Sequence, residues 1–239
     1  MSSSGKEIER LAIVTGGATG LGLACSKRLL ALGYRVLALG MDSEEEIADP
    51  RYQFEQFDVT DSNAIASIAK RFPELDALVN AAGIILHEGK EFTNSGFRKV
   101  MDVNVGGSQE LAFALSDALK ARKGAVVNFA SMWSLFGSAR NPAYSASKGA
   151  VLALTRSLAA AWGGTGVRVN AVAPGWIRTR MSVQAMSDPE RAAPILRRIP
   201  MGDWGEPDDV AAAVTFLLSS DARYINGVLL PIDGGYSIA

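Results

Sequence analysis

The chain has 239 residues, of which 48% are hydrophobic and 21% are charged. This length and balance suit one large α/β domain and differ from the compositions of disordered, collagen-like and membrane-spanning chains. The net charge of −1 gives no sign of a surface for nucleic acid or anionic membranes, and the single cysteine excludes an internal disulfide and a cysteine metal cluster.

The first ten residues, MSSSGKEIER, are polar, and residues 1–9 are expected to form a flexible tail ahead of the domain. They lack the apolar stretch of a secretory signal, and no later run reaches the roughly 20 apolar residues of a membrane span. We therefore expect a cytoplasmic protein without membrane association. With one histidine and one cysteine, no metal site is expected.

Short apolar runs alternate with helical patterns along the whole chain. The runs predicted as strands are Leu11–Thr15, Tyr34–Leu39, Tyr52–Phe57, Ala77–Asn80, Ala125–Ala130, Val167–Val172 and Val228–Ile232. Their apolar character fits a parallel sheet that is buried on both faces. Pro142 and Pro207 mark the first turns of two helices. The alternation predicts one doubly wound α/β domain of about seven strands, with helices on both faces and all carboxyl ends of the strands at one edge.

A glycine-rich turn, TGGATGLG, follows the first predicted strand and opens the first helix. Gly16, Gly20 and Gly22 let the backbone turn sharply and approach a pyrophosphate, and the helix N-terminus offers free N–H groups. The turn lacks the Gly-Lys-Ser/Thr ending of a P-loop, which argues against nucleoside-triphosphate hydrolysis. The sequence predicts a dinucleotide site here, and an ordinary tight turn is the alternative.

Ser131 closes the fifth predicted strand, and Tyr144 and Lys148 lie four residues apart on the next helix, so both project from one face. An ordinary tyrosine has a pKa of about 10, and the Lys148 ammonium is expected to lower it by favouring the phenolate. We expect Tyr144 to act as general acid/base on a substrate oxygen to which Ser131 also donates a hydrogen bond. Singly, Tyr144 and Lys148 could be ordinary helix residues.

Taken in order, these motifs resemble those of the short-chain dehydrogenase/reductases. The similarity runs from about Arg10 to the end and includes TGGATGLG, NAAG at 80–83, Asn104, Ser131, the Y-x-x-x-K pair, Pro174-Gly175 and a closing Asp-Gly-Gly. Each motif alone is weak, and the set in this order is specific. The resemblance implies a Rossmann-type fold, hydride transfer between a nicotinamide cofactor and an alcohol or carbonyl carbon, and a homo-oligomer, either tetramer or dimer.

The resemblance also implies roles for individual residues. Lys148 would bind the nicotinamide ribose, and Asn104 would hold a water in a proton relay, completing a catalytic set of Asn104, Ser131, Tyr144 and Lys148. Asp58 and Val59 would meet the adenine. The implied cofactor-binding residues are Gly16, Thr19, Gly20, Leu21, Gly22, Gly40, Met41, Asp42, Asp58, Val59, Asn80, Ala81, Ala82, Gly83, Tyr144, Lys148, Pro174, Gly175, Ile177 and Thr179.

The end of the second predicted strand bears on the choice between NAD and NADP. NAD-preferring members of the family usually carry an acidic residue there, where this chain has Gly40 and Met41 before Asp42. NADP-preferring members usually offer a basic residue near Thr19 or after this strand, and this chain has neither. Because a 2′-phosphate would lack a cation and would face Asp42, we expect NAD(H) to be favoured over NADP(H).

Large apolar residues gather in the segments that should border the nicotinamide end: Trp133, Phe136, Trp176 and Met181. With Ser131 and Tyr144, we expect Trp133, Trp176 and Met181 to line a pocket for an aromatic, alicyclic or otherwise hydrophobic alcohol or ketone. The alternative is that some of them pack against the helical region after Thr179 or form an oligomer contact. Residues 180–200 are a candidate substrate lid.

Three minor features are given ordinary structural interpretations. His87 is expected to be a plain loop histidine that could touch substrate, Cys25 a buried inert thiol, and Glu44–Glu46 a solvated loop or helix start. Alternative functions are a 3-oxoacyl-(acyl-carrier-protein) reductase, a non-catalytic dinucleotide-sensing regulatory protein on the same fold, and a methyltransferase. The methyltransferase would leave the Tyr144–Lys148 pair unexplained.

Overall fold

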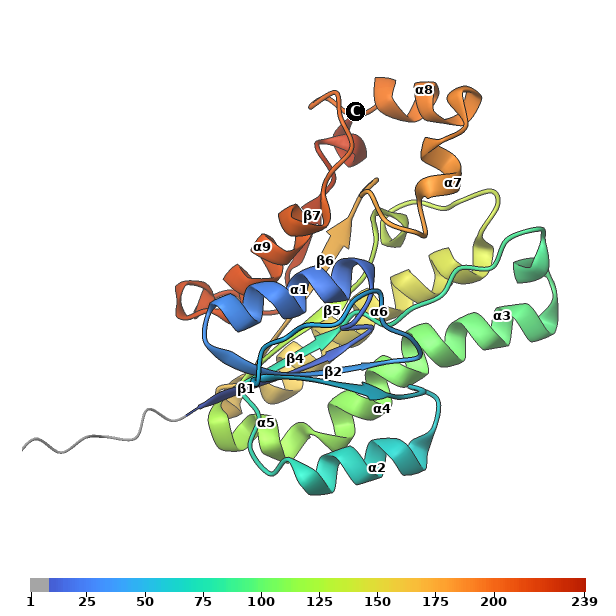
Figure 1. Ribbon diagram of the computed structural model, residues 1–239. Helices are drawn as coiled ribbons and strands as arrows, with labels where there is room; N and C mark the ends of the chain where they lie inside the picture. Colours follow the sequence, from blue (N-terminus) through green and yellow to red (C-terminus); the bar gives the residue numbers. More distant parts are fainter. Residues whose placement is uncertain (1–8) are drawn as a thin grey trace, which may run out of the picture.

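A single parallel sheet forms the centre of the protein (Figure 1). The computed structural model describes residues 9–239, so the tail predicted at residues 1–9 falls almost wholly outside the described residues. The strands run in the order β3-β2-β1-β4-β5-β6-β7. Their bounds are β1 Arg10–Thr15, β2 Tyr34–Gly40, β3 Tyr52–Gln56, β4 Ala77–Asn80, β5 Ala125–Phe129, β6 Arg168–Pro174 and β7 Leu229–Ile232. The predicted doubly wound fold and its strands are confirmed.

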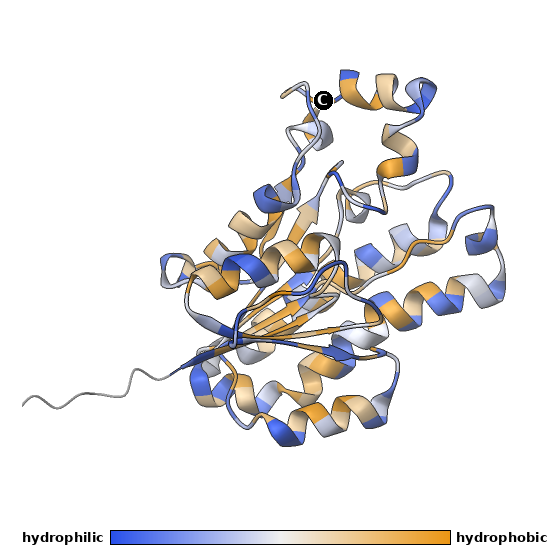
Figure 2. Ribbon diagram, in the orientation of Figure 1, coloured by the Kyte–Doolittle hydropathy of each residue, from blue (hydrophilic) through white to orange (hydrophobic). Residues whose placement is uncertain are grey.

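Helices cover both faces of the sheet (Figure 1). The helices α1 (Gly20–Ala31) and α9 (Pro207–Leu218) pack on one face. The opposite face is covered by α2 (Ser62–Arg71), α4 (Gly107–Ala114), α5 (Ser116–Arg122) and α6 (Pro142–Trp162). Figure 2 shows hydrophobic residues along the strands and hydrophilic ones on the outer sides of the helices. Burial from both sides explains why the central strands are apolar without alternation.

The ends of the helices follow the sequence signals. Gly33 follows α1 with a φ of +83°, a conformation that glycine adopts without strain, and α6 and α9 begin at Pro142 and Pro207. The Asp61 carboxylate caps α2 by accepting hydrogen bonds from two backbone N–H groups. Each signal therefore fixes where a helix begins or ends.

The two halves of the sheet meet between β1 and β4, where the strand order reverses direction. The end of β1 contacts the loop after β4: the Ala82 N–H donates a hydrogen bond to Thr15 Oγ1 at 3.1 Å. Ligands of open α/β sheets bind in the crevice at such a switch point. The fold thus directs attention to the carboxyl ends of β1, β4 and β5.

The segment 180–200 contains two short helices, α7 (Val183–Met186) and α8 (Pro189–Arg197). They lie beyond the carboxyl ends of the strands, at the top of Figure 1. The remaining elements are η1 Lys90–Phe92, α3 Asn94–Met101, the π-helical turn η2 Asp102–Gly106, η3 Met132–Ser134, η4 Gly163–Thr165, η5 Ser220–Ala222 and η6 Tyr236–Ile238. Within residues 9–239, every helix is too short or too polar to span a membrane.

Candidate active site

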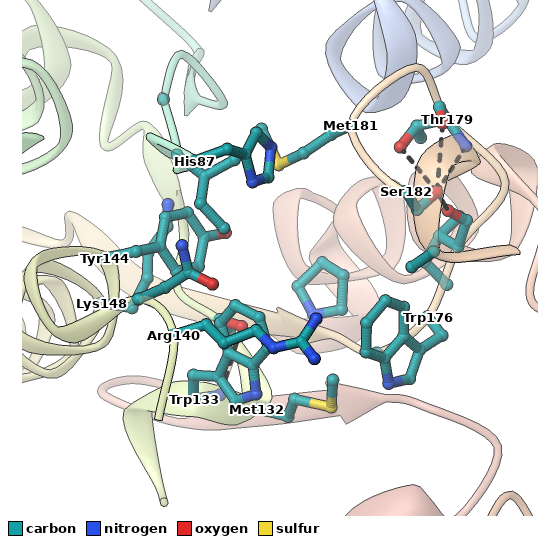
Figure 3. A pocket seen from close by; sticks show the side chains of 18 of the residues that line it. His87, Met132, Trp133, Arg140, Tyr144, Lys148, Trp176, Thr179, Met181 and Ser182 are labelled. Atoms are coloured by element: carbon teal, nitrogen blue, oxygen red, sulfur yellow. Dashed lines mark hydrogen bonds between the residues drawn. The ribbon is translucent and has the colours of Figure 1, made fainter. Parts of the chain in front are cut away.

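A cavity of about 570 Å³ opens at the carboxyl edge of the sheet (Figure 3). It joins the glycine-rich turn, the loop after β4, the end of β5, the start of α6 and the segment after β6. The predicted site residues that line it are Leu21, Ala81, Gly83, Ser131, Trp133, Tyr144, Lys148, Pro174, Gly175, Trp176, Ile177, Thr179 and Met181. Residues from distant parts of the chain therefore meet in one place.

Ser131, Tyr144 and Lys148 all line this cavity. The Lys148 Nζ atom lies 5.3 Å from the centroid of the Tyr144 ring and donates a hydrogen bond of 2.6 Å to the Phe129 carbonyl oxygen at the end of β5. Ser131 forms the N-cap of η3, where its Oγ accepts from the Trp133 N–H at 3.2 Å. The three predicted groups therefore share one site.

Burial dominates the electrostatics of this group. The pKa of Tyr144 is raised to about 12. Desolvation is the largest cause, the Ser131 hydrogen bond acts in the opposite direction, and the charge of Glu91 contributes to the rise. Burial also lowers the pKa of Lys148 to about 8. In the chain alone the pKa of Tyr144 therefore lies above its ordinary value and not below it as expected, because loss of hydration is its largest cause.

Asn104 lies in the π-helical turn η2 and is almost fully buried. Its Oδ1 accepts from the Ile84 N–H at 2.8 Å, and its Nδ2 donates to the Ile84 carbonyl and to Ser147 Oγ, both at 3.0 Å. A Cβ added to Gly83 would lie 3.3 Å from Asn104 Oδ1 and 3.5 Å from Lys148 Nζ. The amide therefore fixes the loop after β4 and keeps one acceptor lone pair near Lys148.

Glu91 is a residue of the site that no motif in the sequence singles out. Its side chain is buried in η1, and Oε2 accepts a 2.9 Å hydrogen bond from the Tyr144 N–H, while Oε1 accepts from the Leu86 N–H at 2.9 Å and from Asn141 Nδ2 at 3.4 Å. A carboxylate at a helix N-terminus also interacts favourably with the helix dipole. Glu91 thus joins the loop after β4 to the helix that carries Tyr144.

Ser134 makes a second connection that the sequence analysis missed. Its Oγ accepts from the Ser131 N–H at 3.3 Å and donates to the Lys148 carbonyl oxygen at 2.8 Å. The start of η3 is thereby tied to α6. The serine three residues after Ser131 completes a capping box, which is the sequence signal that could have identified it.

The glycine-rich turn has a shape that fits a dinucleotide. A Cβ on Gly22 would overlap the Gly16 carbonyl oxygen, so the turn can be this tight only without a side chain there. Gly20 has a φ of +47°, and its added Cβ would find its nearest neighbours in Thr179, at 3.9 Å. Bare backbone therefore faces the space between α1 and the segment after β6, as close approach of a pyrophosphate requires.

The predicted adenosine-side residues surround the same edge of the sheet outside this cavity. Gly40 is the last residue of β2 and is followed by Met41 and Asp42, while Asp58 and Val59 come after β3. Asp58 is exposed and accepts from the Thr60 N–H at 2.9 Å, which lowers the pKa of its carboxyl group. Val59 is buried.

The Asn80 side chain faces the interior of the sheet. It is 2% exposed and donates to Asn128 Oδ1 at 2.9 Å. Its predicted contact with a cofactor is therefore restricted to its backbone. Ala82, the next residue but one, is tied by its N–H to the end of β1, as described above.

Arg180 provides a cation that the sequence analysis did not place near Asp42. The two residues are 138 positions apart, and their side chains pair at 3.3 Å. Arg180 also pairs with Glu44, whose Oε2 accepts from the Gly20 N–H at 3.0 Å. Glu44 lies in an exposed loop, as expected, and its carboxylate also joins α1 to the segment after β6.

Two of the aromatic residues, Trp133 and Trp176, line the cavity, whereas Phe136 packs against the C-terminal segment. Trp133 packs edge-on against Tyr144, with ring centroids 5.6 Å apart, and against Trp176 at 6.3 Å. Phe136, which the sequence groups with the residues bordering the nicotinamide end, is absent from the cavity lining and packs 6.2 Å from Tyr236. The intervening chain turns Phe136 toward the C-terminal segment.

His87 and Cys25 both have the surroundings expected of them. His87 is exposed and borders the cavity (Figure 3). Cys25 is fully buried, and burial raises its thiol pKa to about 12, as expected for an unreactive thiol.

Comparison with known proteins gives a consistent result. Residues 16–237 match the protein family described as enoyl-(acyl carrier protein) reductase. The galactitol 2-dehydrogenase (L-tagatose-forming) of Cereibacter sphaeroides is 39% identical over 95% of this chain and 94% of its own length. The 2-(R)-hydroxypropyl-CoM dehydrogenase of Xanthobacter autotrophicus is 40% identical over 96% of this chain and 99% of its own.

A solved structure is similarly close. A crystal structure of a putative NAD(P)-dependent gluconate 5-dehydrogenase from Beutenbergia cavernae, with bound NADP, superimposes with a TM-score of 0.89 at 38% identity. The match covers 96% of this chain and 97% of that one.

Proposed function

The chain belongs to the short-chain dehydrogenase/reductase family and is an oxidoreductase that acts on CH–OH groups, and we propose that Asn104, Ser131, Tyr144 and Lys148 carry out its reaction. The observation that supports this assignment is the lining of one cavity by Ser131, Tyr144 and Lys148 together with Leu21 of the glycine-rich turn. Such a site interconverts an alcohol and a ketone or aldehyde.

Tyr144 is the general acid/base of the proposed reaction. Its hydroxyl donates a proton to the carbonyl oxygen during reduction and accepts the hydroxyl proton during oxidation. Ser131 donates a hydrogen bond to the same oxygen and orients the carbon for transfer. The bound nicotinamide cofactor supplies or takes up the hydride and, in its oxidised form, brings a further positive charge. Because burial raises the pKa of Tyr144 to about 12, positive charge beside the phenol is needed for base catalysis.

Lys148 has donors left for a second role. One N–H of its ammonium binds the Phe129 carbonyl, and we assign the others to the ribose hydroxyls of the nicotinamide half. The ammonium also favours the phenolate of Tyr144 electrostatically. The free lone pair of Asn104 Oδ1 could accept a hydrogen bond from a relay water.

The glycine-rich turn would hold the pyrophosphate, while Pro174, Gly175, Ile177 and Thr179 would hold the nicotinamide. The family uses NAD(P), and for this chain we propose NAD(H) as the preferred form. Asp42 would repel a 2′-phosphate, and Arg180, the nearby cation, is already engaged by two carboxylates. Because the similar structure from Beutenbergia cavernae has bound NADP, the preference is tested by comparing kcat/KM for NAD⁺ and NADP⁺.

The relatives are named for chemically different substrates, including galactitol, 2-dehydro-3-deoxy-D-gluconate and a dichlorocyclohexadienediol. No single substrate therefore transfers to this chain. We propose a substrate with an apolar body, because Trp133 and Trp176 border the reacting groups. Residues 180–200 would act as its lid, and a homo-oligomer, most simply a tetramer, in the cytoplasm is the expected assembly.

The test is cofactor-dependent turnover. Purified protein is incubated with NAD⁺ or NADP⁺ and a panel of cyclic, aromatic and polyol alcohols, and reduced cofactor is followed by its absorbance. Thermal shift with NAD⁺, NADP⁺ and S-adenosylmethionine is measured in parallel. Stabilisation by a nicotinamide dinucleotide with turnover of at least one alcohol supports the proposal. Stabilisation by a nicotinamide dinucleotide without turnover of any alcohol in the panel would favour a dinucleotide sensor. Stabilisation by S-adenosylmethionine alone would exclude the redox assignment.

A further inference from the structure

The cavity contains positive charge that the chain itself does not neutralise. From this we infer that the substrate carries an anionic group, a carboxylate in the simplest case, which the Arg140 guanidinium binds. The inference rests on the proposed function, since it concerns the substrate of the same site.

Arg140 lies in the connection between η3 and α6, immediately before the helix that carries Tyr144. Figure 3 shows its guanidinium reaching into the cavity between Trp133 and Trp176. Among residues 9–239 it makes no ion pair and no side-chain hydrogen bond, and only its backbone N–H is engaged, by Ser138 Oγ at 3.3 Å. Some arginines of the described chain pair with carboxylates, among them Arg28, Arg122 and Arg180, and others, such as Arg156 and Arg223, do not. Arg140 differs from these because it lines the cavity.

The charged groups that line the cavity do not balance. They are Glu88, Arg140, Lys148 and Arg191. The only carboxylate among them, Glu88, is bound by Lys90 at 3.0 Å, and within the described part of the chain Arg191 forms no ion pair either. The cavity therefore offers cations to a ligand and no uncommitted carboxylate.

The surroundings of Arg140 favour an anion that is attached to an apolar body. A guanidinium presents a planar fork of N–H donors that matches the two oxygens of a carboxylate. Trp133 and Trp176 line the same cavity and offer indole rings to the apolar body of such a ligand, while Arg140 itself is exposed at the cavity. The expectation of a hydrophobic substrate is thereby refined: a ring or chain lies against the tryptophans, with a carboxylate directed toward Arg140.

This inference is tested with matched acids and esters. The probes are 3- and 4-hydroxycyclohexanecarboxylate and their methyl esters, which differ in charge at one end only. Wild type should show a higher kcat/KM for the acid. In Arg140→Met this value should fall about 10- to 100-fold, mainly through KM, because a hydrogen bond between charged groups is lost, while turnover of the ester stays within about twofold. Arg223→Met, which removes an exposed cation outside both the cavity lining and residues 180–200, is the matched control.

A binding measurement covers the case in which these alcohols are poor substrates. Cyclohexanecarboxylate and cyclohexanecarboxamide are titrated calorimetrically into wild type and Arg140→Met, each saturated with NAD⁺. Tighter binding of the carboxylate that is lost in Arg140→Met supports the inference. Equal binding of acid and amide by wild type, or binding of the acid that survives the substitution, overturns it. Turnover of neutral alcohols would then leave the proposed function standing, whereas failure of every alcohol would count against that function.

Discussion

The buried carboxylate of Glu91 allows a prediction that separates a structural effect from an electrostatic one. In Glu91→Gln only one amide oxygen remains to accept hydrogen bonds, while the N–H groups of Leu86 and Tyr144, each at 2.9 Å, point at opposite ends of the group. Whichever way the amide is oriented, at least one backbone donor loses its acceptor. A buried unsatisfied donor costs about 1 to 3 kcal/mol. For a domain of this size we expect the Tm to fall by about 2 to 10 °C.

The same substitution should move the pH profile. The negative charge of Glu91 disfavours the phenolate and raises the pKa of Tyr144. Removing this charge lowers that pKa, so the pH at which kcat/KM for alcohol oxidation begins to rise should move toward acid. Loss of stability alone would not produce such a shift.

The assay is kcat/KM for oxidation of one alcohol across the pH range, together with thermal unfolding. Asp117→Asn, which removes an exposed carboxylate on α5 that pairs with Lys120, serves as the control and should change neither measurement appreciably. An unchanged Tm together with an unchanged profile in Glu91→Gln would refute the reasoning. A profile that moved toward alkaline pH would show that the sign of the electrostatic effect is wrong.

Three further predictions follow from the site. Because burial lowers the pKa of Lys148 to about 8, the unfolded chain binds more protons than the folded one between pH 8 and 10, so the free energy of unfolding should rise across this window. Lys148→Met should reduce that rise by roughly 2 kcal/mol in denaturant titrations, and identical slopes would contradict it. Gly22→Ala should weaken NADH binding at least about tenfold by fluorescence titration, because its Cβ overlaps the Gly16 carbonyl; wild-type affinity would refute the proposed cradle. Arg180→Ala should lower the ratio of kcat/KM for NADP⁺ to that for NAD⁺, because Asp42 then loses its cation, and a higher ratio would show that Arg180 does not shield that carboxylate.

The fold could be predicted from the sequence because its signals are local. Apolar runs give the strands, proline and glycine give the helix ends, and a spacing of four places Tyr144 and Lys148 on one helical face. The meeting of these residues with the glycine-rich turn follows from the parallel topology, which brings the carboxyl ends of the strands to one edge.

The rest of the site depends on contacts that the sequence does not encode locally. Glu91 stands in a polar stretch, HEGKEF, in which nothing distinguishes a buried carboxylate from a solvated one. Arg180 meets Asp42 only through the tertiary fold. The pKa of Tyr144 depends on the extent of burial, which the spacing of Tyr144 and Lys148 does not show; the pKa is therefore raised where the neighbouring ammonium predicted that it would be lowered. The unpaired state of Arg140 likewise becomes visible only once its surroundings are known.

The account rests most directly on the hydroxyl group of Tyr144. Tyr144→Phe removes that group and keeps the ring that packs against Trp133. With the fold verified by circular dichroism and NADH binding verified by fluorescence titration, we predict a fall in kcat of about 10²- to 10⁴-fold, the usual range for loss of a general acid/base. Turnover within a few fold of wild type would contradict the account.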